Sequence, residues 1–516
     1  MPTAIDKVIV ANRKGMDKKY GTPGLAIIDA ALQRMIAADA ARGLATGVVN
    51  IDDAQQMTAV GGTAIVNAKD QAGAKRAVDA IYAKHTPDYI MLLDGPDVVP
   101  HIALSRIPGL TDDDSTIDSD LPYACSSGFS LKISNYMAVT RVVGRLPMAQ
   151  GSSDAAAFAA LIDRCATHVP TTADRYSSYF AISAEVWQQS TQLSLSNLFG
   201  NHADLHLAPT ATHTAIDADL TRLTHFINCH GGRGDPAFYG QRAKKFPVSM
   251  DSPRTGPNVR PGAVVAAECC YGAELYDINL ITSTQPICMS YLLNGAMAFM
   301  GSTTIAYGPP SSNGQADLIT QYFLEKVLQG ASIGRAMLEA RQRFVQSQSM
   351  TGASNLKTLA QFVLYGDPSV QPVQTPKTVA HEFAAANVSA EAVAKDAESG
   401  RKSRRVQARS DGRALAEAVS YPGRRTNVSS AAIERVRTIA KDRGFAAEPE
   451  VFSVTGGPQF LEVAKDMARK PQVVVVSEKR EDHHDVETGK KLPSFHVLVA
   501  YILGDGITAI EESESR

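Results

Sequence analysis

Two short apolar segments, each ending in a reactive side chain and then glycine, constrain this chain most. Residues 223–232 read LTHFINCHGG and deliver His230, and residues 263–272 read AVVAAECCYG and deliver Cys269 and Cys270. Apolar runs of this length that break at glycine are typical of buried strands in a parallel sheet. Because open α/β sheets place their sites at the carboxyl ends of strands, we expect the imidazole and a thiol to meet at one sheet edge.

Strand-like and helix-like patterns alternate along the first three quarters of the chain. Apolar runs at 6–10, 47–52 and 88–95 are separated by amphipathic stretches at 23–43 and 73–86. This alternation predicts an α/β fold with a mostly parallel, doubly wound sheet and helices on both faces. At 516 residues the chain is too long for one hydrophobic core, so several domains are expected.

The composition changes at about residue 376. Residues 377–413 contain many Ala, Lys, Arg and Ser residues and few large apolar ones, which predicts a basic flexible linker. Its arginine cluster at 401–413 also fits a self-cleavage or activation site, or a nucleic-acid arm that lacks aromatic residues for stacking. Residues 414–516 regain strand and helix patterns, including a helix at 457–468, and predict a small C-terminal α/β domain.

Charge and cysteine usage exclude several function classes. The net charge of −2 gives no bulk attraction to nucleic acid or to a membrane surface. No apolar run reaches the roughly 18 residues needed to span a bilayer, and the first residues, MPTAIDKVIVANRKG, lack the pattern of an export signal. The six cysteines form no C-x-x-C pair, which argues against a disulfide framework or a structural zinc site and favours the reducing cytoplasm.

Two segments contain side chains that could bind a metal ion. Residues 108–128 are acidic and rich in turn residues, and we expect a solvated loop; calcium is the alternative, although the spacing is not that of an EF-hand. His483 and His484, between Asp482 and Asp485, fit an exposed loop better than a metal site. We therefore expect no metal ligands and no required cofactor.

The pairing of His230 with a cysteine points to nucleophilic catalysis. A cysteine attacks as the thiolate, and a neighbouring imidazole lowers the pKa of the thiol. The N–H groups of Gly231 and of the nucleophile itself would line an oxyanion hole. Either residue alone has an ordinary structural explanation, because buried cysteines and satisfied histidines are common. The presence of both, each at the end of an apolar run, favours a catalytic role.

The same segments resemble the signature blocks of the clan CD cysteine peptidases, the caspase–gingipain superfamily. HFINCHGG resembles the His-Gly block, and ECCYG at 268–272 resembles the caspase block that contains the nucleophile. Further segments resemble the gingipain-like branch and follow its order between residues 85 and 375: DYIMLLDGPDVVPH, SDLPYA, VVGRLP, LLNGAMAFMGST and FVLYGDPSV.

The resemblance implies a caspase-like (caspase–hemoglobinase) fold, with an N-terminal α/β subdomain at 1–84 and a catalytic domain at 85–376. In this register Cys270 is the nucleophile and forms an acyl-enzyme, and His230 exchanges protons with it. The N–H groups of Gly231 and Cys270 would hold the oxyanion. Glu268 and Asp235 are candidates for a supporting acid.

The position of the gingipain specificity acid falls near Gln188, which is uncharged, so this device for basic substrates is missing. Trp187, the single tryptophan, fits a substrate pocket and a core position equally well. Asp114, Asp118 and Asp120 are further candidates for an acidic pocket.

The leading hypothesis is a cysteine endopeptidase that cuts a specific intracellular protein, in a setting such as bacterial defence or regulated cell death, with a regulatory partner for the C-terminal domain. One alternative is a catalytically silent scaffold that has kept the fold. Another is a Cys-His hydrolase or transferase for small acyl substrates. Reactivity of the thiol at mildly acidic pH would separate the scaffold from the enzymes.

Overall fold

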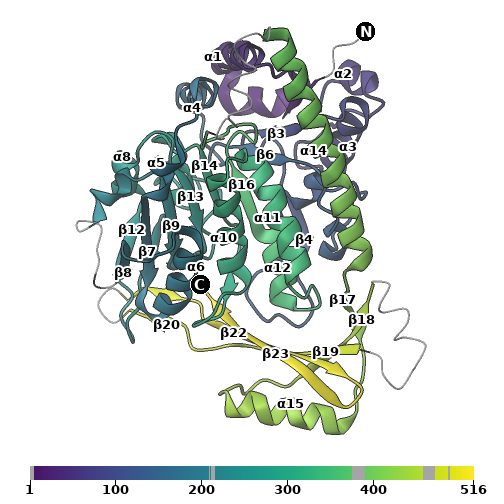
Figure 1. The fold of residues 1–516 in the computed structure, drawn as a ribbon, viewed down its shortest axis with the longest axis vertical. Helices are drawn as coiled ribbons and strands as arrows, with labels where there is room; N and C mark the ends of the chain where they lie inside the picture. The colour runs from purple at the N-terminus through teal and green to yellow at the C-terminus, as the bar shows by residue number, and fades with distance from the viewer. Residues whose placement is uncertain (1–4, 209, 211–215, 375–389, 457–470, 486–488) are drawn as a thin grey trace.

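A ten-stranded sheet forms the centre of the molecule (Figure 1). The computed structural model describes residues 5–208, 210, 216–374, 390–456, 471–485 and 489–516. In spatial order the strands are β2 (Thr46–Asn50), β1 (Lys7–Ala11), β3 (Tyr89–Leu93), β6 (Val143–Leu146), β16 (Phe362–Tyr365), β14 (Ala298–Ser302), β13 (Val264–Ala267), β9 (Thr224–Asn228), β7 (Tyr179–Ala184) and β8 (Leu205–Ala208).

The sheet consists of two parallel halves joined back to back. β2, β1, β3, β6 and β16 run parallel to one another, and so do β14, β13, β9, β7 and β8. β14 and β16 pair antiparallel at the junction. The carboxyl ends of the two halves therefore point in opposite directions, and the strands that carry His230 and Cys270 share one edge.

Helices cover both faces of the sheet, as the alternation of patterns predicts. The central strands are buried along their whole length, which requires cover on both sides. One helix layer contains α1 (Arg13–Ala41), α4 (Ala155–Thr167) and α9 (Ile287–Leu293), and the other contains α6 (Gln188–Phe199), α10 (Gln315–Leu328), α11 (Ile333–Ser347) and α12 (Ala353–Gln361).

Local sequence signals fix where these helices begin. The Asp154 side chain accepts a hydrogen bond from Ala157 N and starts α4, and Ser332 does the same for Arg335 N at the start of α11. The shorter elements around the sheet are α2 (Ala54–Ala59), α3 (Gln71–His85), α5 (Ala173–Ser177), α8 (Ser252–Asn258), β4 (Ile102–Ser105), β5 (Thr116–Ser119), β10 (His230–Gly231), β11 (Ala237–Tyr239), β12 (Val248–Asp251), β20 (His483–His484) and β21 (Lys491–Leu492).

A second, antiparallel sheet forms the C-terminal part of the molecule. Its order is β15 (Tyr307–Gly308), β23 (Gly506–Ser515), β22 (Phe495–Leu503), β19 (Pro471–Lys479), β18 (Glu450–Thr455) and β17 (Tyr421–Arg425), with α15 (Ser430–Asp442) packed on one face. The α/β character expected for 414–516 is confirmed. Its edge strand β15, however, comes from the region 85–376, so this sheet and the central part of the molecule meet there.

The two faces of this sheet pack against different partners because side chains alternate along a strand. Val474 and Val476 pack under α15 in a small separate core. Val473 and Val475 face the other way and belong to the main core of the molecule. The C-terminal domain is therefore joined to the catalytic body by a continuous apolar interface.

Two parts of the expected domain plan differ from the structure. β3 lies beside β1 in the same sheet, so the sheet is not divided at residue 84. Residues 390–418 form one helix, α14 (Ala390–Ala418), in place of the expected flexible linker, whereas 377–389 and the expected helix at 457–468 lie outside the described residues. No helix in the described part of the chain has the length and apolar character to cross a membrane.

Candidate active site

Four neighbouring parallel strands bring the predicted site residues to one edge. The carboxyl end of β9 leads to His230, that of β13 to Cys270, and that of β7 to Trp187. β14, on the other side of β13, leads into the loop that contains Ala306 and continues into β15. The segments that carry His230 and Cys270 therefore lie at the same edge of the sheet.

The Cys270 thiol is buried against the loop that follows β14. Its Sγ accepts a hydrogen bond from Ala306 N at 3.3 Å and lies 3.6 Å from Ala306 O. Burial raises the pKa of this thiol to about 12, and hydrogen bonds from the backbone of Ala306 and of Arg516 oppose that shift. The neighbouring Cys269 is fully buried and its Sγ faces Ile227 O at 4.0 Å, so Cys270 is the cysteine at the site.

The His230 ring is enclosed by aromatic side chains. Its ring centroid lies 4.3 Å from that of Trp187, 5.5 Å from Phe246 and 5.4 Å from His483. Nε2 bonds to Oε1 of Gln241 at 2.6 Å; because an amide oxygen only accepts, Nε2 carries the proton and Nδ1 the lone pair. Burial lowers the pKa of His230 to about 3, so the imidazole is neutral near pH 7.

Gly231 is required by the close approach of two backbones. A side chain at this position would place its Cβ 1.8 Å from the carbonyl oxygen of Cys270. Only glycine allows β10 to run so close to the turn that carries the thiol. This contact explains the His-Gly sequence and holds the His230 segment beside Cys270. Within the described residues, however, no hydrogen bond joins His230 to Cys270.

The buried side chain of Arg516 lies against Trp187, Gly308 and the acidic Asp317, and we call these surroundings the arginine pocket. The Arg516 Nη2 atom lies 3.1 Å from Asp317 Oδ1 on α10 and donates to Pro309 O at 2.8 Å. The guanidinium carbon lies 4.5 Å from the centre of the Trp187 ring. Both charged side chains are fully buried, so the pair lies in a site shielded from water.

Glu268, on the other side of this pocket, is paired with Asp317. Burial and the neighbouring Asp317 charge raise the pKa of Glu268 well above its ordinary range. Burial also raises the pKa of Asp317, but there the Arg516 charge acts in the opposite direction. The Arg516 guanidinium therefore favours the charged form of Asp317, whereas the neighbouring Asp317 charge disfavours the charged form of Glu268.

The wall of the pocket is the backbone of β15 at Gly308. A Cβ at this position would lie 2.3 Å from Arg516 Nη2 and 2.4 Å from Nε. The absence of a side chain therefore leaves the space that the guanidinium occupies. Gly308 fixes the width of the pocket as Asp317 fixes its charge.

The backbone of the last residues adds a strand to β15. Ser515 pairs with Tyr307 and Glu514 with Gly308, in antiparallel register. Arg516 N donates to Ala306 O at 3.0 Å, and Cys270 N donates to Arg516 O at 3.3 Å. The carbonyl of an arginine residue is thus held on the amide of the candidate nucleophile, while its side chain lies in the arginine pocket.

The structure separates the remaining predicted residues. Trp187 lines the pocket, whereas Gln188 lies half-exposed at the start of α6. The expectation that Glu268 or Asp235 supports His230 is not met, because Gln241 bonds the ring. Glu268 belongs to the arginine pocket, and Asp235 accepts from Tyr239 and binds Lys490. The Gly231 N–H makes no bond to Arg516 O among the described contacts, whereas Cys270 N does.

Asp317, Gly308 and Gln241 were not identified from the sequence. Asp317 lies in the amphipathic segment 315–330. Its place on the apolar side of that segment, where the structure buries it, is the one available signal. Gly308 lies in the two-residue strand β15 and Gln241 in a loop, and no sequence pattern distinguishes either of them. The role of Arg516 could not be recognised from the sequence, because it depends on contacts with residues about 200 or more positions away in the chain.

The acidic segment 108–128 is not the solvated loop that was expected. Asp112 and Asp114 are buried and bind Lys357, with Nζ–O distances of 2.5 and 2.7 Å. Asp114 also accepts from Ile305 N at 2.9 Å and so supports the loop beside Cys270. Asp120 is bound to Arg145. These acids therefore support the fold near the site and do not line the substrate pocket.

No group of three or more His, Cys, Asp or Glu side chains in the described ranges is arranged to hold a metal ion. His483, considered above as a ligand, packs its ring between those of Phe246 and His230.

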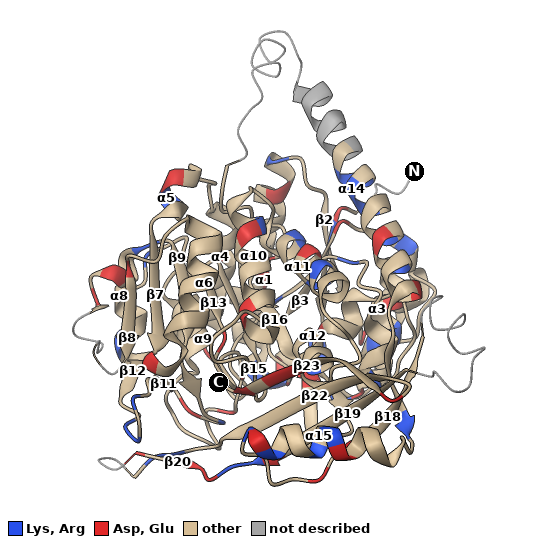
Figure 2. Ribbon diagram, turned by 60° about the horizontal axis from the view of Figure 1, so that its bottom comes forward, with Lys and Arg blue, Asp and Glu red and all other residues tan. Residues whose placement is uncertain are grey.

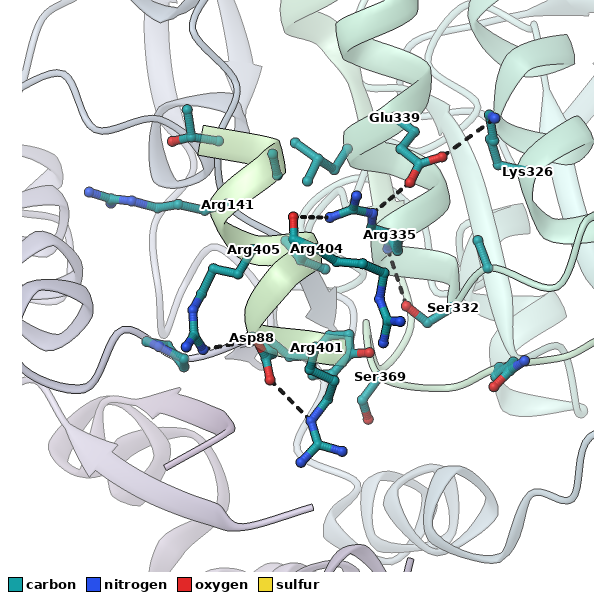
Figure 3. A pocket seen from close by; sticks show the side chains of 18 of the residues that line it. Asp88, Arg141, Lys326, Ser332, Arg335, Glu339, Ser369, Arg401, Arg404 and Arg405 are labelled. Carbon is teal, nitrogen blue, oxygen red and sulfur yellow. Dashed lines mark hydrogen bonds and ion pairs between the residues drawn. The ribbon is translucent and has the colours of Figure 1, made fainter. Parts of the chain in front are cut away.

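A separate cavity of about 360 Å³ lies between α14 and the catalytic body (Figure 3). Arg401 and Arg405 lie in the segment that was expected to be a flexible linker. Both bind the Asp88 carboxylate, with N–O distances of 3.1 and 2.9 Å. Arg335 binds Glu339 at 2.6 Å. Two arginines of the basic cluster thus dock the helix α14 on the body of the molecule.

Comparison with models of protein families shows which family this chain belongs to. The model of peptidase family C25 matches residues 2–373. The chain belongs to this family. Family C25 is the gingipain family of clan CD, so the protein is a cysteine peptidase, as the resemblance implied. None of the curated proteins matches this C25 peptidase.

Two solved structures are similar to this C25 peptidase. One, described as a protease, is 13% identical and aligns over 99% of this chain and 97% of its own, with a TM-score of 0.45. The other is separase in the separase–securin complex of Saccharomyces cerevisiae, which is 14% identical over 45% of this chain and 14% of its own, with a TM-score of 0.29.

Proposed function

We propose that this C25 peptidase is an endopeptidase that cleaves the bond after arginine, with Cys270 as nucleophile and His230 as base. The observation that carries the proposal is the extended segment on β15, which places an arginine carbonyl on the Cys270 N–H and its guanidinium beside Asp317. An edge strand that receives a chain in antiparallel register is a common way to bind extended peptides.

The reaction follows from the positions of the two side chains. The Sγ proton passes to Nδ1 of His230, and the thiolate attacks the carbonyl carbon of the substrate arginine. The N–H of Cys270, with that of Gly231, stabilises the oxyanion. The C–N bond then breaks, the amine leaves with the proton from His230, and a thioester remains on Cys270. Water, deprotonated by His230, hydrolyses the thioester and restores the thiol.

The preference for arginine rests on the shape of the pocket as well as its charge. Asp317 supplies a desolvated carboxylate, Trp187 a ring face for the planar guanidinium, and Gly308 the space beside it. A planar guanidinium stacks on an aromatic face better than an ammonium does, so arginine should be preferred to lysine.

We further propose a cytoplasmic role with a selected protein substrate, in a setting such as defence or regulated cell death. All six cysteines are free and buried, which suits a reducing compartment. The C-terminal domain lies over the site, so access is restricted. This restriction favours one substrate, or a regulatory partner of that domain, over general protein degradation.

The scaffold and small-acyl alternatives explain less of the geometry. A silent scaffold needs neither a free thiol at a strand end nor a glycine that admits the His230 segment beside it. A small acyl substrate would not need the antiparallel contacts that β15 makes with three successive residues. Both alternatives make different predictions in the same experiment.

The test compares the protein with its Cys270→Ala variant, using a pool of peptides in excess that differ at the residue before the scissile bond. Mass spectrometry of the products should show cleavage after arginine by the wild type and none by the variant. Cys269→Ala is the matched control and should retain cleavage, because its thiol faces Ile227. Cleavage by the Cys270→Ala variant would refute the assignment, and binding of arginyl peptides without hydrolysis by either protein would support the scaffold.

A further inference from the structure

We propose that the segment 506–516 is a built-in inhibitor that occupies the substrate site of its own chain. The inference rests on the proposed function in one respect, that peptides bind where Arg516 lies. It adds a regulatory role for the C-terminal domain: the domain holds the last residues in the cleft, and a substrate must displace them.

The first support is the completeness of the occupation. Arg516 is 1% exposed. Here the backbone of Arg516 bonds to both Ala306 and Cys270, and its side chain binds Asp317. In Figure 2 the C-terminus lies beside β15, and in Figure 1 it lies near α6, above the strands of the C-terminal sheet.

The second support is competition for the same groups. The Cys270 N–H that would stabilise the oxyanion already donates to the Arg516 carbonyl. The Asp317 carboxylate that would bind a substrate arginine already binds Arg516. Trp187, which would form the pocket wall, also donates from Nε1 to Glu514 at 2.5 Å. An arginyl substrate cannot bind the Cys270 N–H and Asp317 until Arg516 leaves.

The third support is the state of the two reactive side chains. With the segment in place, Cys270 is a buried thiol of raised pKa and His230 a buried imidazole of lowered pKa, and no hydrogen bond joins them within the described residues. Arg516 is itself one of the charges that lower the pKa of His230. Burial therefore keeps both groups neutral near pH 7 while the segment is docked.

The contacts that hold Arg516 are incomplete, which favours its release from the site. The Nε and Nη1 atoms of Arg516, and Oε2 of Glu268, are buried without hydrogen-bond partners within the described residues. The ladder between β15 and β23 spans only two residue pairs, whereas β23 pairs with β22 over most of its length. The β22 pairing reaches Glu514, and the Ser515 hydroxyl accepts from Phe495 N, so Arg516 lies beyond these contacts and can leave the site while the C-terminal sheet stays folded.

The test measures the access of iodoacetamide to Cys270 in the full chain, with the alkylated peptide quantified by mass spectrometry. The Arg516→Ala variant should alkylate at Cys270 at least tenfold faster than the wild type. The matched control is Glu512→Ala on the same strand, whose side chain binds only the exposed Arg443 at 3.2 Å, and it should react as the wild type does. An unchanged rate in Arg516→Ala would overturn the proposal.

A second measurement separates release of the segment from loss of the fold. The five other cysteines are buried and report global unfolding if they become labelled. A synthetic hexapeptide with the sequence of residues 511–516, EESESR, should slow the alkylation of Cys270 in Arg516→Ala, whereas EESESA should not. Equal effects of the two peptides would also overturn the proposal.

The outcome is independent of turnover. If Arg516→Ala exposes Cys270 and EESESR protects it, but no peptide is cleaved, the proposed function fails and the inhibitory segment stands. If arginyl peptides are cleaved equally fast by the wild type and by Arg516→Ala, and both alkylate equally, the proposed function stands and the inhibitory segment fails.

Discussion

Arg145 and Arg516 are two of the buried arginines of this molecule, and their surroundings differ in an informative way. Arg145 on β6 donates from Nε and Nη2 to the two oxygens of Asp120, at 2.9 and 2.6 Å, and from Nη1 to Asp94 O and Val99 O. Arg516 uses Nη2 alone for its described side-chain hydrogen bonds, and its Nε and Nη1 have none.

The difference separates a structural arginine from a bound one. Each unpaired buried donor costs about 1–3 kcal/mol, so a partner for every guanidinium nitrogen, as Arg145 has, favours permanent burial. Arg145 has these partners within one half of the sheet. The Arg516 pocket recognises the charge and the plane of the guanidinium but leaves donors unpaired. That arrangement suits a site that binds and releases arginine side chains.

The largest expected difference is in stability. Arg145→Ala leaves the buried Asp120 carboxylate without its partner and should lower the free energy of unfolding by about 3–5 kcal/mol. Arg516→Ala should lower it by less, because the shorter side chain lets water reach Asp317, which can then take up a proton. Urea unfolding followed by circular dichroism measures both. Equal losses would contradict the distinction between the two arginines.

The next effect concerns the charge of the pocket. Asp317→Asn removes the carboxylate that faces the guanidinium and should lower kcat/KM for arginyl peptides about 100-fold, or about 2.7 kcal/mol. Asp163→Asn, which removes an exposed partner of Arg34, is the control and should leave kcat/KM unchanged. A loss in Asp317→Asn that is equally large for peptides with an uncharged residue before the scissile bond would show a general structural defect.

A smaller effect is expected from the width of the pocket. Gly308→Ala places a methyl group where the guanidinium lies and should reduce kcat/KM for arginyl peptides about tenfold, equivalent to about 1.4 kcal/mol. Peptides with a small residue at that position should lose less. Gly128→Ala, with no atom within 4 Å of the added Cβ, serves as the control. Equal losses for large and small residues would place Gly308 outside the pocket.

The smallest effect is a pH dependence of the docked segment. Burial lowers the pKa of His230 from 6.5 to about 3 in the folded protein with its docked segment. Between these two pH values the unfolded chain therefore binds more protons than this folded state. The contribution of His230 to the docked state is therefore fully present above about pH 6.5 and is lost as the pH falls toward 3. NMR titration of the ring should show a pKa well below 6.5 in the wild type and a higher one in Arg516→Ala. Identical values in both would contradict the role of Arg516 at this histidine.

The sequence predicts the sheet edge because the signals for it are local. Apolar runs ending at His230 and Cys270 mark two buried strands, and parallel pairing of neighbouring strands places their ends together. The family relationship could also be recognised, because its segments occur in order along the chain. These features depend on contiguous residues and on a general rule for α/β sheets.

The pocket could not be predicted because it is assembled from distant parts of the chain. Trp187, Glu268, Gly308 and Asp317 come from four different elements, and each is ordinary in its local sequence. Trp187 could be named as a pocket residue but not separated from a core residue. Helix α14 was missed for a similar reason: its sequence is poor in large apolar residues, and pairing of Arg401 and Arg405 with Asp88 holds it on the body.

The most direct test of the central claim is covalent trapping of the nucleophile. Arg516→Ala is incubated with a peptidyl ketone electrophile that carries arginine before the reactive carbon, and the modified residue is located by mass spectrometry. The account predicts a single adduct at Cys270, absent from the Arg516→Ala/Cys270→Ala double variant and strongly reduced by Asp317→Asn. An adduct at Cys269 or at another cysteine, or none in a protein whose Cys270 reacts with iodoacetamide, would contradict it.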